Sequence, residues 1–159
     1  MNSKKKIIID LDVITVSIWD KEGEQVEIAK KFVERVKSQE FHVVNPFFLI
    51  ERVLKWKYDA LKEEIKEFYV NYSNKLLSDT EINNQTNIKK IAPNEILPEI
   101  MKIGIKDEDA FLAFVGSLFN IEYLVTFNRK HLKNNTQKIN TVLRRYNLNE
   151  IKIVLPDEI

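Results

Sequence analysis

Residues 7–14 read IIIDLDVI, an apolar run that ends in two carboxylates. Three consecutive β-branched residues, Ile7 to Ile9, are typical of a strand that is buried on both faces of a parallel sheet. The strand stops at Asp10 and Asp12, which places negative charge at its carboxyl end. Ligands bind at this edge in open α/β folds. The stretch therefore predicts a parallel α/β fold with a site for a cation at the end of the first strand.

The composition is that of one globular domain covering residues 1–159. A chain of this length can bury a core without cross-links. It contains no cysteine, which excludes disulfides and thiolate metal sites. The formal net charge is +1 with 31% charged residues, so net charge alone indicates no class of partner. Only 3 glycines and 4 prolines interrupt the chain, which favours helices over Gly-rich phosphate loops.

Three consecutive lysines, Lys4 to Lys6, precede the first apolar run. This run is short and ends in acids, so we interpret it neither as a signal peptide nor as a membrane span. We therefore expect a soluble, cytoplasmic protein without a membrane partner.

Hydrophobic periodicity predicts an alternation of strands and helices. Strands are expected at residues 7–9, 41–45, 122–126 and 151–155. Helices are expected at residues 13–19, 26–39, 47–54, 56–77, 94–103 and 110–119, with a last one at about 139–146. Pro46 and Pro98 are each placed near the first turn of a helix, and the Asn-rich segment 78–90 is predicted to be a polar loop without a core role. The alternation implies parallel pairing with right-handed crossovers.

The candidate site residues each follow a strand or open a buried helix. They are Asp10 and Asp12 after the first strand, Glu51 in the helix after the second, Asp109 before helix 110–119, and Thr126 and Asn128 after the third strand. The carboxyl ends of parallel strands lie on one edge of a sheet, so these groups can share one pocket. Clustered carboxylates repel one another unless a divalent cation neutralises them. Oxygen ligands, without cysteine and without histidines at ligand spacing, favour Mg²⁺ or Mn²⁺ over Zn²⁺.

Four short motifs, in this order, resemble those of PIN-domain ribonucleases, the family that contains the VapC-type toxins of toxin–antitoxin pairs. They are residues 10–14 (DLDVI), Glu51 after a short strand, residues 109–113 (DAFLA) and residues 124–128 (LVTFN). Residues 151–158 (IKIVLPDE) resemble the family's last strand and its Pro-acid-acid end, so the resemblance covers nearly the whole chain. It implies a three-layer α/β/α sandwich with a central parallel sheet, Mg²⁺ or Mn²⁺ in an acidic pocket, and cleavage of RNA. A cognate antitoxin protein and a homodimer are the further partners that it implies.

The resemblance also implies a role for each matching residue. Asp10 corresponds to the first metal ligand, Glu51 to the second and Asp109 to the third. Thr126 is similar to the hydroxyl that the family places beside the site. Asp12 occupies a position where the family has Asn or Asp.

One departure from the family pattern concerns the fourth acid. The family commonly has this acid where the chain has Asn128, or three residues further on, where it has His131. An amide oxygen can ligate a metal or orient its water, but it contributes no charge. We therefore expect a weaker second metal site, a single-metal enzyme or a loss of activity. In an active enzyme the metal would activate a water, and Asp109 or Glu51 would share in ligation or accept the proton of that water.

Two other functions fit parts of the same pattern. The strand followed by Asp10-x-Asp12 also resembles the nucleophile motif of haloacid-dehalogenase-like phosphatases. That family places its Thr-ended strand and its lysine before the final acidic pair, whereas here Asp109 precedes Thr126, and Glu51 would have no role. A catalytically silent PIN-like module that binds RNA or a protein is the second alternative, and Asn128 is the residue that suggests it.

Each candidate also has a structural interpretation. Asp10 and Asp12 could cap the following helix, and Glu51 could pair with Arg52 or Lys55. His42 and His131 are interpreted as ordinary polar residues. RNA contacts would come from basic residues next to the site, which are Arg52, Lys55 and Lys57, and Arg129, Lys130 and Lys133, although such residues are often only solvated. Trp19 and Trp56 would permit dimerisation.

Overall fold

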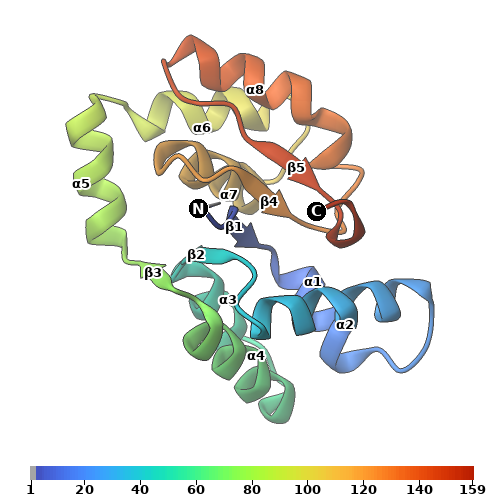
Figure 1. Cartoon of the computed structure of the whole chain (residues 1–159). Helices are drawn as coiled ribbons and strands as arrows, with labels where there is room; N and C mark the ends of the chain where they lie inside the picture. Colours follow the sequence, from blue (N-terminus) through green and yellow to red (C-terminus); the bar gives the residue numbers. More distant parts are fainter. Residues whose placement is uncertain (1–2) are drawn as a thin grey trace.

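The computed structural model describes residues 3–159 and is built around a parallel sheet of five strands (Figure 1). The strands are β1 (Lys6–Ile9), β2 (His42–Pro46), β3 (Lys75–Leu77), β4 (Tyr123–Val125) and β5 (Lys152–Val154). Their order in the sheet is β3-β2-β1-β4-β5, and every neighbouring pair is parallel. β1 is thus the central strand, as expected for a strand buried on both faces.

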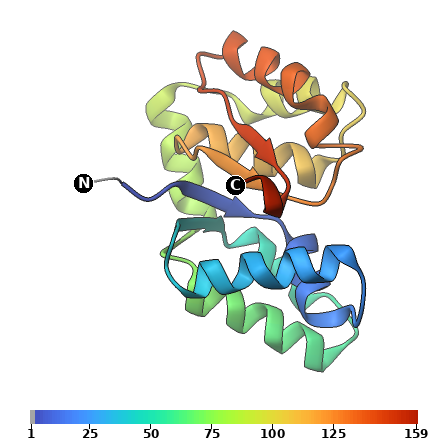
Figure 2. The same ribbon diagram turned by 45° about the vertical axis from the view of Figure 1, so that its right-hand side comes forward.

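Eight α-helices flank the sheet in the described part of the chain. They are α1 (Leu11–Trp19), α2 (Glu24–Lys37), α3 (Phe48–Leu54), α4 (Asp59–Tyr72), α5 (Asp79–Lys89), α6 (Pro93–Met101), α7 (Asp107–Leu118) and α8 (Thr136–Arg145), with short 3₁₀ turns η1 (Lys133–Asn135) and η2 (Pro156–Glu158). Figures 1 and 2 show α1, α2 and α4 on one side of the sheet and α6, α7 and α8 on the other. This arrangement confirms the predicted three-layer α/β/α sandwich.

The core is continuous from β1 to the helices on both sides. Ile7, Ile8 and Ile9 are fully buried, as their uninterrupted apolar pattern predicts. On one face α7 approaches the sheet closely at Gly116, where an added Cβ would collide with the side chain of Ile151 and touch that of Ile8. Glycine at this position therefore lets α7 pack closely on the sheet without displacing the side chain of Ile151.

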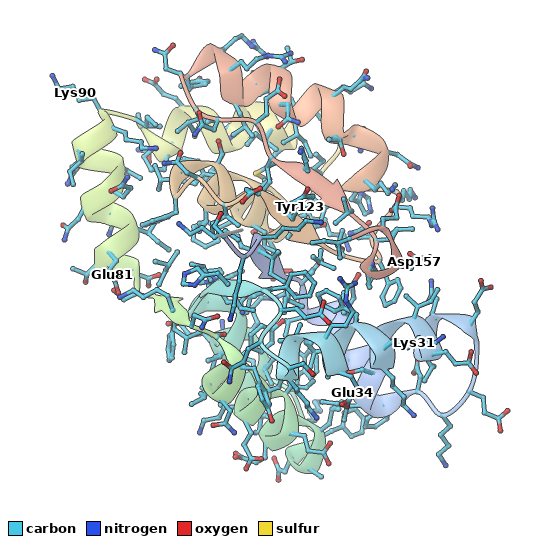
Figure 3. The ribbon with its side chains drawn as sticks, in the orientation of Figure 1. Lys31, Glu34, Glu81, Lys90, Tyr123 and Asp157 are labelled. Atoms are coloured by element: carbon cyan, nitrogen blue, oxygen red, sulfur yellow. The ribbon has the colours of Figure 1, made fainter. Side chains whose placement is uncertain are left out.

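Charged side chains cover the outer faces of the flanking helices. Lys31 and Glu34 lie on the outer face of α2, and Glu81 and Lys90 lie at opposite ends of α5 (Figure 3). Tyr123 on β4 is flanked by the ammonium groups of Lys5 and Lys152, which lie 5.5 and 5.3 Å from its ring centroid (Figure 3). No helix among residues 3–159 is long and apolar enough to cross a lipid bilayer.

The order in which strands are added to the sheet reverses once, beside β1. From β1 the chain continues to β2 and β3 on one side, and it then returns to β4 and β5 on the other side. The carboxyl ends of β1 and β4 border this switch point, where open α/β sheets form a crevice for ligands. The amide of Asp10 donates to the carbonyl of Val125 over 2.9 Å, so the two strand ends lie side by side.

Segment 56–77 does not form one helix, and this prediction is wrong. Helix α4 ends at Tyr72, and residues Lys75–Leu77 form the edge strand β3. Asn74 holds the edge strand in place, since its amide donates to the carbonyl of Val43 over 2.8 Å and its Oδ1 accepts from the amide of Val43 over 2.7 Å. The apolar spacing of Tyr72, Leu76 and Leu77 also fits a helix, so periodicity alone could not locate the break.

The prediction of a polar loop at residues 78–90 is also wrong. This segment is the helix α5, whose first turn is capped by Ser78, because Ser78 Oγ accepts from the amide of Glu81 over 3.1 Å. Ile82 and Thr86 are 4% exposed, so one side of the helix contributes to the core. The Ser-x-x-Glu spacing at residues 78–81 is a helix-start signal that outweighs the asparagines following it.

Two prolines also lie elsewhere than predicted. Pro46 is the last residue of β2 rather than the first turn of a helix, and it is paired in register with Leu77. Pro98 lies inside α6, whose first position is taken by Pro93. Pro93 is the proline at the helix start, where a missing amide hydrogen is tolerated.

Candidate functional site

Asp10 is the first residue after the central strand and the N-cap of α1. Its backbone is extended, with φ −68° and ψ 151°, and its Oδ1 accepts from the amide of Leu11 over 2.8 Å. The side chain is 6% exposed. The structural interpretation of Asp10 as a helix cap is therefore confirmed. Oδ2 of the same carboxylate accepts from the Thr126 hydroxyl.

Two buried side chains hold the backbone directly before Asp10. The amide of Ile9 donates to Asn45 Oδ1 over 2.9 Å, and the hydroxyl of Tyr69 donates to the carbonyl of Ile9 over 2.8 Å. Asn45 and Tyr69 are both fully buried. They position the end of β1, and no sequence pattern distinguished them from ordinary strand and helix residues.

Thr126 joins the carboxylates of Asp10 and Asp12. Its hydroxyl oxygen lies 2.8 Å from Asp10 Oδ2 and 3.3 Å from Asp12 Oδ2, and it accepts from the amide of Asn128 over 2.9 Å. A hydroxyl carries a single proton, so Thr126 donates to Asp10, the closer acceptor. The contact with Asp12 then lacks a proton unless Asp12 carries one.

Asp12 is fixed by the backbone that follows β4. Both of its oxygens accept from the amide of Phe127, at 3.1 and 3.2 Å. Asp12 thus ties the first turn of α1 to the loop after β4. It does not make the N-cap contact that was one of its two interpretations, because Asp10 occupies that position.

Burial raises the pKa values of both carboxyl groups. The pKa of Asp10 is raised to about 7, first by desolvation and then by the charge of Asp12, while the hydrogen bond from Thr126 opposes the shift. Desolvation raises the pKa of Asp12 to about 6, against the hydrogen bond from the Phe127 amide. Near neutral pH the pair therefore holds a proton unless another cation takes its place.

Asp109 lies in the first turn of α7, beside Asn128. Nδ2 of Asn128 donates to Asp109 Oδ2 over 3.1 Å, and Oδ1 of Asn128 accepts from the amide of His131 over 3.0 Å. Burial raises the pKa of Asp109, while His131 and Arg52 lower it. Asn128 thus presents a hydrogen-bond donor to Asp109, at the position where the PIN-domain family commonly has an acid.

These groups open into one cavity of about 390 Å³. It is lined by Asp10, Leu11, Asp12, Thr15, Val16, Arg52, Trp56, Lys106, Glu108, Asp109, Asn128 and His131. Thr126 is fully buried behind this lining. The structure therefore brings together Asp10, Asp12, Asp109, Thr126 and Asn128, as the parallel arrangement predicted.

Glu51 does not line this cavity, although it lies on the predicted helix. Its side chain is exposed on α3, whereas its neighbour Arg52 lines the cavity and forms an ion pair of 2.5 Å with Glu108. Successive helical residues point about 100° apart, which follows from 3.6 residues per turn. An ion pair of Glu51 with Arg52 or Lys55, its structural interpretation, is not found among residues 3–159 either.

Basic residues line one part of the cavity. Arg52 was expected as an RNA contact. Lys106 and the acid Glu108 also line the cavity and were not predicted, because charged residues at the start of a helix are common and do not by themselves indicate a site. Among the other basic candidates, Lys133 is engaged with Glu158 in an ion pair. His131 lines the cavity, and its Nδ1 lies 3.2 Å from the carbonyl of Gly104.

The donor chemistry of the cavity suits a hard divalent cation, but the carboxylates are not gathered into a cage. Within residues 3–159 no group of three or more acidic, histidine or cysteine side chains is arranged to hold a metal ion. Asp10 and Asp12 both approach the Thr126 hydroxyl, whereas Asp109 accepts from Asn128. Mg²⁺ is commonly bound by one or two carboxylates, with waters and substrate phosphates as the other ligands, so such a pair is sufficient for it.

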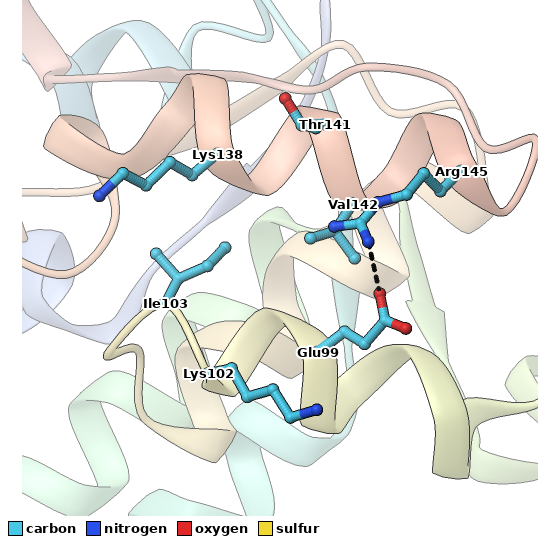
Figure 4. Close-up of a pocket in the computed structure, with 7 residues that line it drawn as sticks. All are labelled: Glu99, Lys102, Ile103, Lys138, Thr141, Val142 and Arg145. Carbon is cyan, nitrogen blue, oxygen red and sulfur yellow. Dashed lines mark ion pairs between the residues drawn. The ribbon is translucent and has the colours of Figure 1, made fainter.

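A second cavity, of about 450 Å³, lies between α6 and α8 (Figure 4). Lys102, Lys138 and Arg145 line it together with Glu99, which pairs with Arg145 at 3.4 Å and accepts from the Tyr146 hydroxyl over 2.9 Å. None of the carboxylates of the first cavity lines it. The contacts of Glu99 with Arg145 and Tyr146 join the two helices.

Neither a protein-family model nor a curated protein sequence matches the chain. The functional interpretation therefore depends on the geometry of the site.

Proposed function

We propose that this chain is a metal-dependent ribonuclease that hydrolyses RNA phosphodiester bonds at the cavity of Asp10, Asp12 and Asp109. One observation carries the proposal: the buried carboxylate of Asp10 and the partly buried carboxylate of Asp12 lie within 2.8 and 3.3 Å of the same Thr126 hydroxyl, at the switch point of the sheet. A bound cation would relieve the repulsion between these two carboxylates and would thereby stabilise the folded protein. An arrangement that is unfavourable without a ligand is typical of functional sites.

The proposed cation is Mg²⁺ or Mn²⁺. Asp10 and Asp109 are the proposed ligands, with Asp12 as an additional oxygen donor. A bound divalent cation would lower the pKa of a water and stabilise negative charge on the phosphoryl oxygens. Glu51 is exposed outside the cavity lining, so the proposed ligand set does without it.

The residues around these carboxylates have roles that follow from their charges and hydrogen bonds. Arg52 and Lys106 line the same cavity as the carboxylates, and their cationic groups would bind the phosphates on either side of the scissile bond. Thr126 positions the carboxylate of Asp10 by its hydrogen bond. Asp109 would accept the proton of the attacking water when it is not engaged as a ligand.

Cleavage of a labelled RNA in the presence of Mn²⁺ tests the proposal. We expect Asp10→Asn to abolish cleavage, because it removes the charge at the centre of the site and keeps the size of the side chain. Asp79→Asn is the matched control, since Asp79 is an exposed acid in the first turn of α5. Equal cleavage by wild-type protein and Asp10→Asn would overturn the assignment.

A phosphatase is the alternative enzyme, and the same protein can be assayed for it. A phosphatase would use Asp10 as a nucleophile, although both oxygens of Asp10 already accept hydrogen bonds, from Leu11 and Thr126. Release of phosphate from a small phosphomonoester, without RNA cleavage, would favour this alternative.

A metal-independent RNA-binding module is the second candidate function. It is favoured by Asn128, whose Nδ2 faces Asp109 over 3.1 Å. Such a module would bind RNA equally well with and without Mn²⁺. It would also show no thermal shift on addition of the metal.

A further inference from the structure

A groove with aromatic walls adjoins the carboxylate cavity. Its volume is about 460 Å³, and it is lined by Thr15, Trp19, Lys55, Trp56, Lys57, Tyr58 and Leu61. Trp19 and Tyr58 are 51% and 63% exposed. Their ring centroids lie 5.1 Å apart at an interplanar angle of 56°. Two large aromatic rings thus support each other while they present apolar area to the solvent.

The groove and the cavity share part of their lining. Thr15 and Trp56 line both. Helix α1 connects them as well, because it begins next to Asp10 and ends at Trp19. A rise of 1.5 Å per residue places Trp19 roughly 10 Å along the helix from Asp12. A strand with a phosphate at the carboxylates would therefore extend into the groove.

Two lysines add positive charge to the aromatic groove. Lys55 and Lys57 are exposed, and neither forms an ion pair with an acidic side chain within residues 3–159. Aromatic rings that stack on bases, combined with cations along the backbone path, are the elements of single-stranded nucleic-acid binding. Unpaired bases are required for this, since paired bases do not expose their faces.

We propose that this groove binds the unpaired nucleotides of an RNA next to its scissile phosphate. This inference rests on the proposed ribonuclease function and names its substrate class as single-stranded RNA. Bases stack on Trp19 and Tyr58, and phosphates contact Lys55 and Lys57. The positive charge of the groove favours this polyanion over an apolar helix or a second copy of the chain as its occupant.

Binding measured without catalysis tests the inference. Anisotropy of a fluorescein-labelled single-stranded oligoribonucleotide is recorded in EDTA, which prevents metal-dependent cleavage. We expect Trp19→Ala and Tyr58→Ala each to weaken binding about tenfold, the effect of one lost base–aromatic stack. Ile88→Ala is the control, because Ile88 is an exposed apolar residue on α5 with an exposed fraction of 72%.

An abasic oligonucleotide of the same length separates stacking from charge. Wild-type protein should bind it about tenfold more weakly than the base-containing strand, whereas Trp19→Ala should discriminate less between the two. Lys55→Gln and Lys57→Gln should weaken binding of both strands equally and reduce the salt dependence of the affinity.

The outcomes distinguish this inference from the proposed activity. If wild-type protein cleaves RNA with Mn²⁺ but the aromatic variants bind as tightly as wild type, the groove has another occupant and the inference is wrong. If the aromatic variants lose affinity although no cleavage occurs with any metal, the groove assignment stands and the ribonuclease proposal falls. Absence of RNA binding by wild-type protein in EDTA would overturn the groove assignment, and absence of cleavage with Mn²⁺ as well would overturn both.

Discussion

The hydroxyl of Thr126 lies 2.8 Å from Oδ2 of Asp10, and the two residues are 116 positions apart in the chain. This hydrogen bond joins the end of β4 to the end of β1 at the switch point of the sheet. It also stabilises the ionised form of Asp10, against the burial and the neighbouring charge of Asp12 that raise its pKa.

The stability of the metal-free protein should fall as the pH rises from about 4 to about 7. The folded-state pKa values of Asp10 and Asp12 are raised from 3.8 to about 7 and about 6, so folding favours their protonated forms. Their stabilising contribution is therefore complete below the unfolded-state pKa and is lost as the pH passes through the folded-state values. Thermal unfolding in EDTA over this pH range measures the effect.

Substitution Asp10→Asn should flatten this pH profile. The amide can still accept from the Leu11 amide and interact with the Thr126 hydroxyl, but it carries no charge. At about pH 8 the variant should have a higher melting temperature than wild type. In a chain of this size, each kcal/mol gained in the free energy of unfolding raises the melting temperature by about 2–4 °C. At about pH 4 the difference should be smaller. A lower melting temperature for the variant at the higher pH would contradict the assignment of an unfavourable buried charge.

Mn²⁺ should raise the melting temperature of the wild-type protein at neutral pH. A ligand that binds only the folded state at 100 times its dissociation constant stabilises it by about 2.7 kcal/mol. Asp109→Asn should abolish most of the shift, because Asp109 is a proposed ligand. Glu51→Gln should retain it, since Glu51 is exposed outside the cavity lining. A shift that disappears in Glu51→Gln and persists in Asp109→Asn would reverse the proposed ligand assignment.

Removal of the Thr126 hydroxyl should destabilise the fold. Thr126→Val keeps the shape of the buried side chain but leaves Asp10 Oδ2 and the amide of Asn128 without this partner. The expected loss is about 1–3 kcal/mol in the free energy of unfolding, measured with urea. Thr126→Ser keeps the hydroxyl and is the control for the hydrogen bond. The loss in Thr126→Val should be larger at high pH, where Asp10 is ionised, and an equal loss at all pH values would argue against this bond.

An acid at position 128 should make the site more dependent on metal. Asn128→Asp replaces the Nδ2 donor to Asp109 with a second negative charge, so the metal-free protein should melt at a lower temperature at about pH 8. Mn²⁺ should then produce a larger thermal shift than in wild type, because it relieves the added repulsion. Asn134→Asp, an exposed substitution of the same type in η1, controls for the change in net charge.

Several elements could be predicted because their local signals agree with the final fold. The run Ile7 to Ile9 predicted a buried parallel strand, and all three residues are fully buried. The predictions failed at β3 and α5. Leu76 and Leu77 fit a helical pattern as well as a strand, and only pairing with β2 decides between them. The asparagines of residues 78–90 suggested a loop, whereas the cap at Ser78 and the burial of Ile82 stabilise a helix.

The sequence by itself determined the parallel α/β class and the placement of acids after strands, because β-branched runs and strand ends are local properties. It thereby selected Asp10, Asp12, Asp109, Thr126 and Asn128 as neighbours. Only the tertiary structure decided that Arg52 rather than Glu51 faces the cavity, and that Asn128 turns its amide nitrogen toward Asp109. Those outcomes depend on helix orientation and on hydrogen-bond partners more than a dozen residues away, which no local pattern encodes.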